Sequence, residues 1–473
     1  MPKVSCFFST ALLVGFSFSL HASPEELTST LADQKHLAVT IYNDNLALIK
    51  DQRTISLPSG HSALAFREIS AQIQPETALL RSLSTPNSLS AVEQNFDFDL
   101  LSPQKLLEKY IGKQIGIIKT HPTTGEEHTE FGTLLSTHQG AVIKIGDRIE
   151  TGHRNRFVFP SVPDNLRDKP TLTMQINNAQ SETQNLELSY LTQGLGWKAD
   201  YVMSINKDDT KMDLNGWVTL TNTSGTHYPN AQLQLVAGSI NRAPQTLRRN
   251  MRMEVDMVTM AASEPMTQES LFEYHLYTLG HKTTLNNNQT KQVALLSASN
   301  IPIKKELRLQ GHQHYYYNRA GDLGRKLPVE VYTLFENDKK NHLGIPLPKG
   351  VIRAYKQDRK GSAQFIGEDS IQHTPKNETV RIKLGSAFDV TASKKQTDYQ
   401  RIATKLVESE YLITLNNAKN ESVTVTVVEP IPGDWKIVNE SHPHQKSSSS
   451  TATWLITVPA ESKTQLTYRV QIK

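Results

Sequence analysis

The chain has 473 residues, a formal net charge of +4 and a single cysteine, Cys6. A chain of this length can bury a large core and is expected to form about three domains. Its basic and acidic residues are interspersed, without the basic stripe that follows a phosphate backbone, so we do not expect nucleic acid as a partner. Because the only cysteine lies near the N-terminus, burial and not disulfides must stabilise the rest of the chain.

The N-terminal segment has the pattern of a secretory signal peptide. Lys3 is followed by an uncharged run from Val4 to Leu20 and then by small residues that end at Ala22. We therefore expect residues 1–22 to be removed on export, with an uncleaved membrane anchor as the alternative. No later segment is apolar for long enough to be a transmembrane helix. The sequence thus predicts a mature protein in the periplasm or associated with the outer membrane, without a transmembrane span.

Alternating apolar residues dominate the rest of the chain and predict β-strands. The chain is therefore predicted to be mainly β, with several antiparallel β-sandwich or barrel modules and one or a few short helices. Trp197 and Trp217 each follow a glycine and lead into such a run, so both are predicted to lie in a core. The clearest alternation occurs in segments 172–176, 186–190, 380–384, 423–427 and 466–472.

One segment predicts a helix, because Ser102 can cap it, Pro103 suits its first position and Gly112 follows its last turn. The methionine-rich segment 247–270 has neither strand nor helix period. We interpret it as a long loop, either an adaptable contact surface or a segment without regular structure.

The predicted domains are an N-terminal β domain (23–98), the helix with a small barrel-like insert (99–165), a central β domain (166–390) and a C-terminal immunoglobulin-like β-sandwich (391–473).

The sequence GHQHYYYNR holds the strongest metal-like pattern. On a strand, His312 and His314 would project together with Tyr316, while Tyr315 and Tyr317 would form an aromatic strip on the other face. Two histidines at this spacing are weak evidence for a metal by themselves. The aromatic strip would suit stacking on a sugar or on a partner chain, and a tyrosine-rich strand that simply packs well is the alternative.

A second polar strand is predicted in EYHLYTL. Alternation would place Glu273, His275 and Tyr277 on one face and Tyr274 and Leu276 on the other. His275 could supply a binding group, but a metal site needs three or four ligands and no spacing supplies the rest. Aromatic packing on one side with polar groups in water is the other interpretation.

The order of several motifs resembles that of exported bacterial proteins with the domain of unknown function 4139. These motifs are YLTQGLGWKADYV, NGWVTLTNTSGTHYPNAQLQLVAG, EYHLYTL, IPLPKGVIRAY, FIGEDSIQHTP and LGSAFDV, and the resemblance runs from about Ala38 to the C-terminus. It implies an envelope protein of mostly β structure. It implies no established activity and offers no catalytic residues to carry over.

The sequence contains no serine hydrolase elbow, zinc-protease HExxH or phosphate-binding loop. Together with the export signal and the β architecture, this favours a non-enzymatic scaffold or binding module without a cofactor, which contacts an envelope protein or a polysaccharide. The alternative is a metal-dependent periplasmic hydrolase that uses His312 and His314 with a distant carboxylate. That alternative rests on spacing alone.

Overall fold

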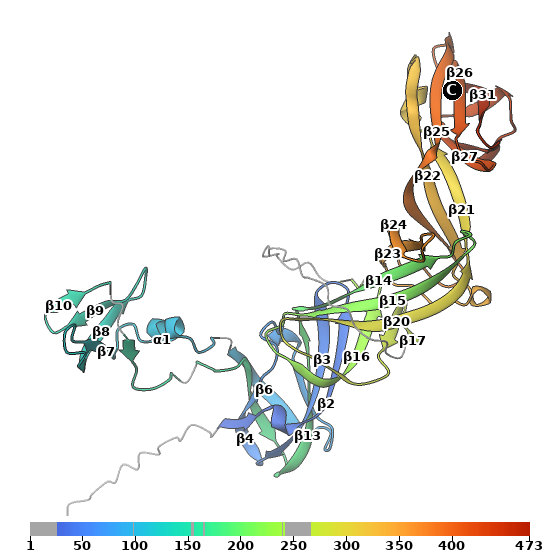
Figure 1. The fold of residues 1–473 in the computed structure, drawn as a ribbon. Coiled ribbons are helices and arrows are strands. Elements are labelled where there is room, and N and C mark those ends of the chain that lie inside the picture. The colour runs from blue at the N-terminus through green and yellow to red at the C-terminus, as the bar shows by residue number, and fades with distance from the viewer. Residues whose placement is uncertain (1–25, 98, 153–155, 164–165, 239, 242–265) are drawn as a thin grey trace, which may run out of the picture. The chain divides into compact units, whose positions relative to one another are not determined.

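The computed structural model describes residues 26–473, with gaps at 98, 153–155, 164–165, 239 and 242–265 (Figure 1). It confirms that the described chain is mainly β. The predicted signal peptide, residues 1–22, and the part of the methionine-rich segment up to residue 265 lie outside the described residues.

The described chain falls into two compact units. Unit 1 contains residues 26–37 and 49–191, and unit 2 contains residues 38–48 and 192–473. The chain passes from unit 1 to unit 2 within β2 (Gln34–Tyr42) and returns within β3 (Leu46–Leu57).

A four-stranded sheet with the order β1-β4-β12-β6 belongs to unit 1. β1 runs parallel to β4, whereas β12 is antiparallel to both β4 and β6. The predicted alternation of 172–176 is confirmed, because Leu172, Met174 and Ile176 are all buried. The remaining elements outside the insert include the antiparallel pair β13 and β5 and two 3-10 helices. The bounds are β1 (Glu26–Ser29), η1 (Leu31–Asp33), β4 (Gly60–Arg67), η2 (Pro75–Thr77), β5 (Leu79–Ser82), β6 (Leu89–Asp97), β12 (Thr171–Asn178) and β13 (Glu182–Thr192).

The insert contains α1 and a five-stranded antiparallel sheet with the order β10-β9-β8-β7-β11. The predicted helix is confirmed, and the Ser102 side chain caps it by accepting a hydrogen bond from the backbone N–H of Lys105. A Cβ at position 132 would lie 2.7 Å from the side chain of Ile143, so the small core there requires Gly132. The bounds are α1 (Pro103–Lys109), β7 (Gln114–Thr120), β8 (Glu127–Ser136), β9 (Val142–Ile145), β10 (Arg148–Glu150) and β11 (Arg156–Val158).

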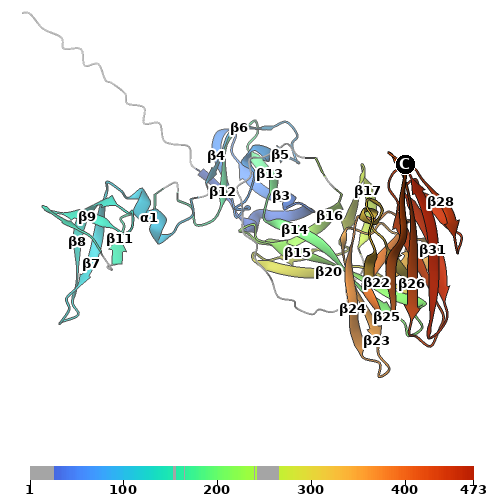
Figure 2. The same ribbon diagram turned by 90° about the horizontal axis from the view of Figure 1, so that it is seen from above.

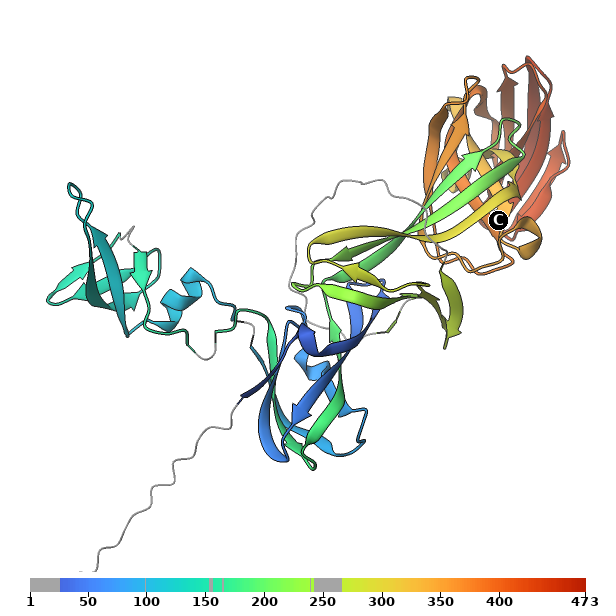
Figure 3. The same cartoon turned by 60° about the horizontal axis from the view of Figure 1, so that its bottom comes forward.

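The central sheet of unit 2 has the order β20-β15-β14-β23-β24, and Figure 3 shows its long curved strands in green and yellow. β14 pairs with β15 antiparallel and with β23 parallel. Trp197 lies opposite Leu220 on the core face and is buried, as predicted. Trp217 lies opposite Asp200 on the other face and is only half-buried, so its predicted core position is wrong. The bounds are β14 (Leu195–Ile205), β15 (Lys211–Asn222), β20 (Gln289–Pro302), β23 (Gly350–Gln357) and β24 (Ala363–Ile371).

A further group of strands in unit 2 forms around β16. β16 pairs in parallel with residues 38–42 of β2 and antiparallel with β18 and β19. β17 pairs antiparallel with β18. All five residues of β17 are exposed. The bounds are β16 (Tyr228–Ala237), β17 (Thr267–Leu271), β18 (Tyr274–Thr278) and β19 (Thr283–Leu285).

The C-terminal sheet has nine strands in the order β28-β31-β26-β25-β22-β21-β27-β30-β29. Figure 2 shows β22, β25, β26 and β31 side by side. Its core contains two tryptophans, Trp435 and Trp454, among aliphatic and tyrosine side chains. The bounds are β21 (Lys304–Gln310), η3 (Gln313–Tyr316), β22 (Asp322–Glu336), η4 (Lys339–Asn341), β25 (Thr379–Ala403), β26 (Leu406–Asn417), β27 (Val423–Pro430), β28 (Trp435–Glu440), β29 (Gln445–Ser448), β30 (Thr451–Val458) and β31 (Ser462–Ile472).

Candidate functional site

The predicted histidine pair lies on a turn and not on a strand. β21 ends at Gln310, and the chain then forms the 3-10 helix η3 with His312 as its N-cap and His314 inside it. Both side chains are exposed, and their rings stack with centroids 5.3 Å apart. The predicted strand through these residues is therefore wrong. Alternation of residue types cannot distinguish a strand from a single tight turn of this length.

The geometry gives little support to a metal at these histidines. Across the residues that the structure describes, no group of three or more His, Asp, Glu or Cys side chains could hold a metal ion. His275 lies on β18, where its Nδ1 is 2.9 Å from the Nε2 of Gln268 on β17. His275 is thus engaged with a neighbouring amide.

β18 also departs from the predicted separation of polar and apolar faces. Leu276 is buried as predicted, but Tyr277 next to it is buried as well. The Tyr277 hydroxyl donates a hydrogen bond to the backbone carbonyl of Pro346 at 3.0 Å. Burial raises the pKa of Tyr277 well above its ordinary value. The strand is thus covered on both sides at this point, which its residue pattern does not reveal.

The three consecutive tyrosines have different environments. Tyr317 is 56% exposed, whereas Tyr315 and Tyr316 are both buried. The strand prediction had placed Tyr315 and Tyr316 on opposite faces, but the turn at η3 directs both into the C-terminal core. Tyr316 reaches a buried carboxylate there, because its hydroxyl donates to Glu429 Oε2 at 2.7 Å.

These tyrosines belong to an enclosed group that we call the lysine–tyrosine cluster. At its centre, Lys394 Nζ lies 2.6 Å from Glu429 Oε2, and each of the two side chains is only 1% exposed. The Tyr316 hydroxyl is also 2.7 Å from the Tyr468 hydroxyl. Four tyrosine rings surround the amine, with centroids 4.6 to 5.7 Å from Nζ. The cluster consists of Tyr315, Tyr316, Lys394, Tyr411, Glu429 and Tyr468.

Burial governs the ionisation of this cluster. It lowers the pKa of Lys394, against the opposing influence of Glu429. It raises the pKa of Tyr411 to about 12, and it also raises the pKa values of Tyr316 and Tyr468 well above their ordinary value. Perturbed pKa values often mark functional sites, but structural ion pairs perturb them too. Because Lys394 and Glu429 are enclosed, an external substrate has no access to them.

The sequence analysis missed Lys394, Glu429, Tyr411 and Tyr468. Strand alternation could have indicated that Lys394 points inward. It lies two positions after the buried residue Ala392 in β25, and residues two apart on a strand share a face. Glu429 likewise follows Val427 by two positions in β27. Strand parity therefore places both charges inward. It does not show that they meet.

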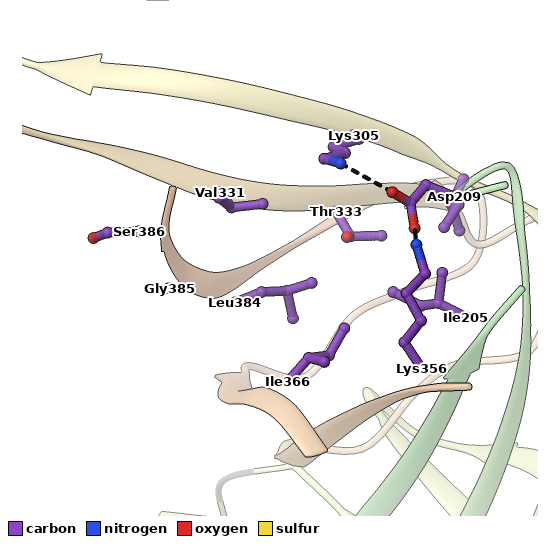
Figure 4. Close-up of a pocket in the computed structure, with 11 residues that line it drawn as sticks. Ile205, Asp209, Lys305, Val331, Thr333, Lys356, Ile366, Leu384, Gly385 and Ser386 are labelled. Carbon is purple, nitrogen blue, oxygen red and sulfur yellow. Dashed lines mark hydrogen bonds and ion pairs between the residues drawn. The ribbon is translucent and has the colours of Figure 1, made fainter. Parts of the chain in front are cut away.

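An open pocket of about 260 Å³ lies elsewhere in unit 2, where β14 and the loop after it approach β21 to β25 (Figure 4). Much of its wall is aliphatic, with Ile205, Ile366 and Leu384 among the contributing residues. Thr333 and Ser386 add hydroxyl groups. Such a pocket, with an apolar wall and a few polar groups, has the usual composition of a ligand-binding site.

The charged groups of this pocket share one carboxylate. Asp209, in the loop between β14 and β15, accepts a hydrogen bond from Lys305 Nζ at 2.9 Å and a second one from Lys356 Nζ (Figure 4). Burial by itself would raise the pKa of Asp209, but the bonds from Lys356 and Lys305 outweigh it and hold the pKa below its ordinary value. Two ammonium groups and one carboxylate leave a net charge of +1. The pocket is therefore suited to an anionic group next to an apolar one.

In the described part of the chain, no helix is both long and apolar enough to cross a membrane.

No match is found among curated proteins. The model of one family, described as "Domain of unknown function (DUF4139)", matches residues 186–473. This match starts later than the expected resemblance from Ala38, but it covers more than half of the chain. The chain therefore belongs to the family defined by the domain of unknown function DUF4139.

Proposed function

We propose that this chain is a non-enzymatic binding module, exported to the periplasm or the outer membrane, which contacts an envelope protein through the Asp209 pocket. The observation that carries this proposal is the pair of lysines, Lys305 and Lys356, at an aliphatic wall. Their side chains are 37% and 31% exposed, so both lie at the surface of the pocket.

The composition of the pocket favours a protein partner over a polysaccharide. Sugars mainly offer hydroxyl groups, whereas the wall formed by Ile205, Ile366 and Leu384 needs an apolar side chain. A peptide with an acidic residue between aliphatic residues could pack against the aliphatic wall and pair its carboxylate with the two amines. Exposed aromatic residues lie close along the chain, since Phe365 precedes Ile366 and Phe388 follows Ser386 by two positions. Aromatic side chains are enriched among the residues that dominate protein interfaces.

A binding experiment with defined probes tests the proposal. A short peptide with one glutamate between leucines should bind the purified mature chain in calorimetry, and the same peptide with glutamine should bind more weakly. The double variant Lys305→Gln, Lys356→Gln should weaken binding of the glutamate peptide by about tenfold or more, because the ion pairs are partly desolvated. Lys304→Gln is the matched control, since Lys304 is the exposed neighbour on the same strand.

Equal binding of the glutamate peptide by the double variant and the wild type would show that the Asp209 pocket is not the binding site. If alginate, an acidic polysaccharide, binds and the peptide does not, the pocket would be a polysaccharide site and the protein-partner proposal would be wrong. Thermal unfolding of each variant checks that the loss of binding is not a loss of fold.

The metal-dependent hydrolase rests on a single structural observation, the exposed stack of His312 and His314. Elemental analysis of the purified mature protein separates this alternative from the binding module. Stoichiometric zinc or manganese that disappears in His312→Ala, His314→Ala would favour the hydrolase.

A further inference from the structure

The buried pair in the lysine–tyrosine cluster is incompletely hydrogen-bonded. Within the described part of the chain, Glu429 Oε1 has no hydrogen-bond partner. Among the same residues, Lys394 Nζ forms a single hydrogen bond, to Glu429 Oε2. An ammonium group has three N–H donors, and a carboxylate can accept at both oxygens. Burying charges with such partial compensation is unfavourable, because desolvation can exceed the attraction between them.

From this arrangement we propose that Lys394 and Glu429 condense to form an amide cross-link between β25 and β27. The reaction first moves a proton from the ammonium to the carboxylate, which gives a neutral amine and a carboxylic acid. The amine lone pair then attacks Cδ of Glu429 and forms the C–N bond. Oε1 leaves as water with the proton first transferred to the carboxyl group and one of the two protons that remain on Nζ, and Oε2 remains as the amide oxygen. No oxidant or other reactant is needed, since an ammonium and a carboxylate give an amide and one water.

The site positions the two reacting groups and one hydrogen-bond donor. Lys394 Nζ and Glu429 Oε2 are already 2.6 Å apart, so little movement brings Nζ to Cδ. The Tyr316 hydroxyl donates to Oε2 at 2.7 Å and can stabilise the negative charge that develops there during attack. Two groups held in this way react at a high effective concentration. Tyr316 is thus assigned as the oxyanion donor, and Tyr468 as its positioning residue through the contact between their hydroxyls.

The amide also fits the site better than the ion pair does. It keeps one oxygen, which accepts the hydrogen bond from Tyr316, and it eliminates the oxygen that has no partner. It replaces three N–H donors by one and removes both charges from the enclosed core. Gly311 leaves room for this group, because a Cβ there would lie 2.3 Å from Glu429 Oε2.

Mass spectrometry of the wild-type chain tests the proposal directly. After proteolysis of the denatured protein, the peptides that contain Lys394 and Glu429 should appear as one branched product, lighter than their sum by one water. On a denaturing gel the intact linked chain should migrate faster than the unlinked one. Recovery of both peptides unlinked and at full mass from the folded wild type would overturn the proposal.

Variants assign the roles within the cluster. Lys394→Met should abolish the branched product, whereas Lys395→Met, which changes the exposed neighbouring lysine, should retain it. Tyr316→Phe should slow the linkage by about tenfold or more after refolding, as the loss of an oxyanion donor does in enzymes. An unchanged rate in Tyr316→Phe would refute its assigned role. The cross-link does not depend on the Asp209 pocket, so either proposal can fail without the other.

Discussion

Each unit contains a buried ion pair, and the two pairs differ in how completely they are hydrogen-bonded. In unit 1, Arg53 donates to Asp51 Oδ2 at 2.8 and 3.0 Å and to the backbone carbonyls of Ser29 and Arg67, each at 3.0 Å. In unit 2, Lys394 bonds to a single carboxylate oxygen, Glu429 Oε2. The guanidinium thus joins β1, β3 and β4, whereas the amine makes one hydrogen bond and is surrounded by four tyrosine rings.

The difference follows from the chemistry of the two cations. A guanidinium keeps its proton and presents five donors in a fixed plane, so it can satisfy several acceptors at once. An ammonium on a flexible stem loses its proton more readily when it is buried. We therefore assign a structural role to the Arg53 pair and a chemical one, as proposed above, to the Lys394 pair.

The largest expected effect comes from Arg53→Met. The substitution leaves Asp51 buried without a counter-charge and removes the donors to the carbonyls of Ser29 and Arg67. We expect a loss of about 3 to 5 kcal/mol in the free energy of unfolding of unit 1, measured by urea denaturation. Arg156→Met, at an exposed arginine of the same unit, is the control.

A second substitution sharpens this result. If the carbonyl contacts matter as much as the charge, Asp51→Leu combined with Arg53→Met should restore only part of the lost stability. Complete restoration would show that the role of Arg53 is limited to neutralising Asp51.

A smaller loss is expected for Tyr316→Phe in unit 2. It removes the hydroxyl that donates to Glu429 and contacts Tyr468, so one buried acceptor loses its donor. The expected loss in the free energy of unfolding is about 1 to 3 kcal/mol, measured by urea denaturation. Tyr317→Phe is the matched control, because Tyr317 is 56% exposed and should tolerate the change. Equal stability of the two variants would contradict the view that this hydroxyl is needed in the core.

The smallest effect concerns pH. Burial raises the pKa of Tyr411 from 10.0 to about 12, so the folded state keeps this proton after the unfolded state has lost it. The stability from this group is therefore complete below pH 10 and is lost as the pH rises through 12. Chemical unfolding at increasing pH, followed by circular dichroism, should show this decline, and Tyr411→Phe should reduce it. A decline that is as steep in Tyr411→Phe as in the wild type would contradict the assignment.

Local patterns predicted the elements of the fold well. The alternating segments 172–176 and 423–427 lie within β12 and β27, and the capped helix lies at α1. These signals depend on residues that are neighbours along the chain. The turn at His312 and His314 could not be predicted in this way, because its residues also alternate and only the packing of Tyr315 and Tyr316 reveals η3.

The sequence by itself determined that the chain is mainly β, and its residue alternation is consistent with inward positions for Lys394 and Glu429, although the sequence analysis did not identify either residue. Only the tertiary structure decided that these two residues meet, since β22 and β21 lie between β25 and β27 in the order of the sheet. It also decided which lysines share Asp209, because Lys305 and Lys356 come from distant strands. The physical reason is that strand parity depends on local geometry, whereas strand pairing depends on the burial achieved by the whole core.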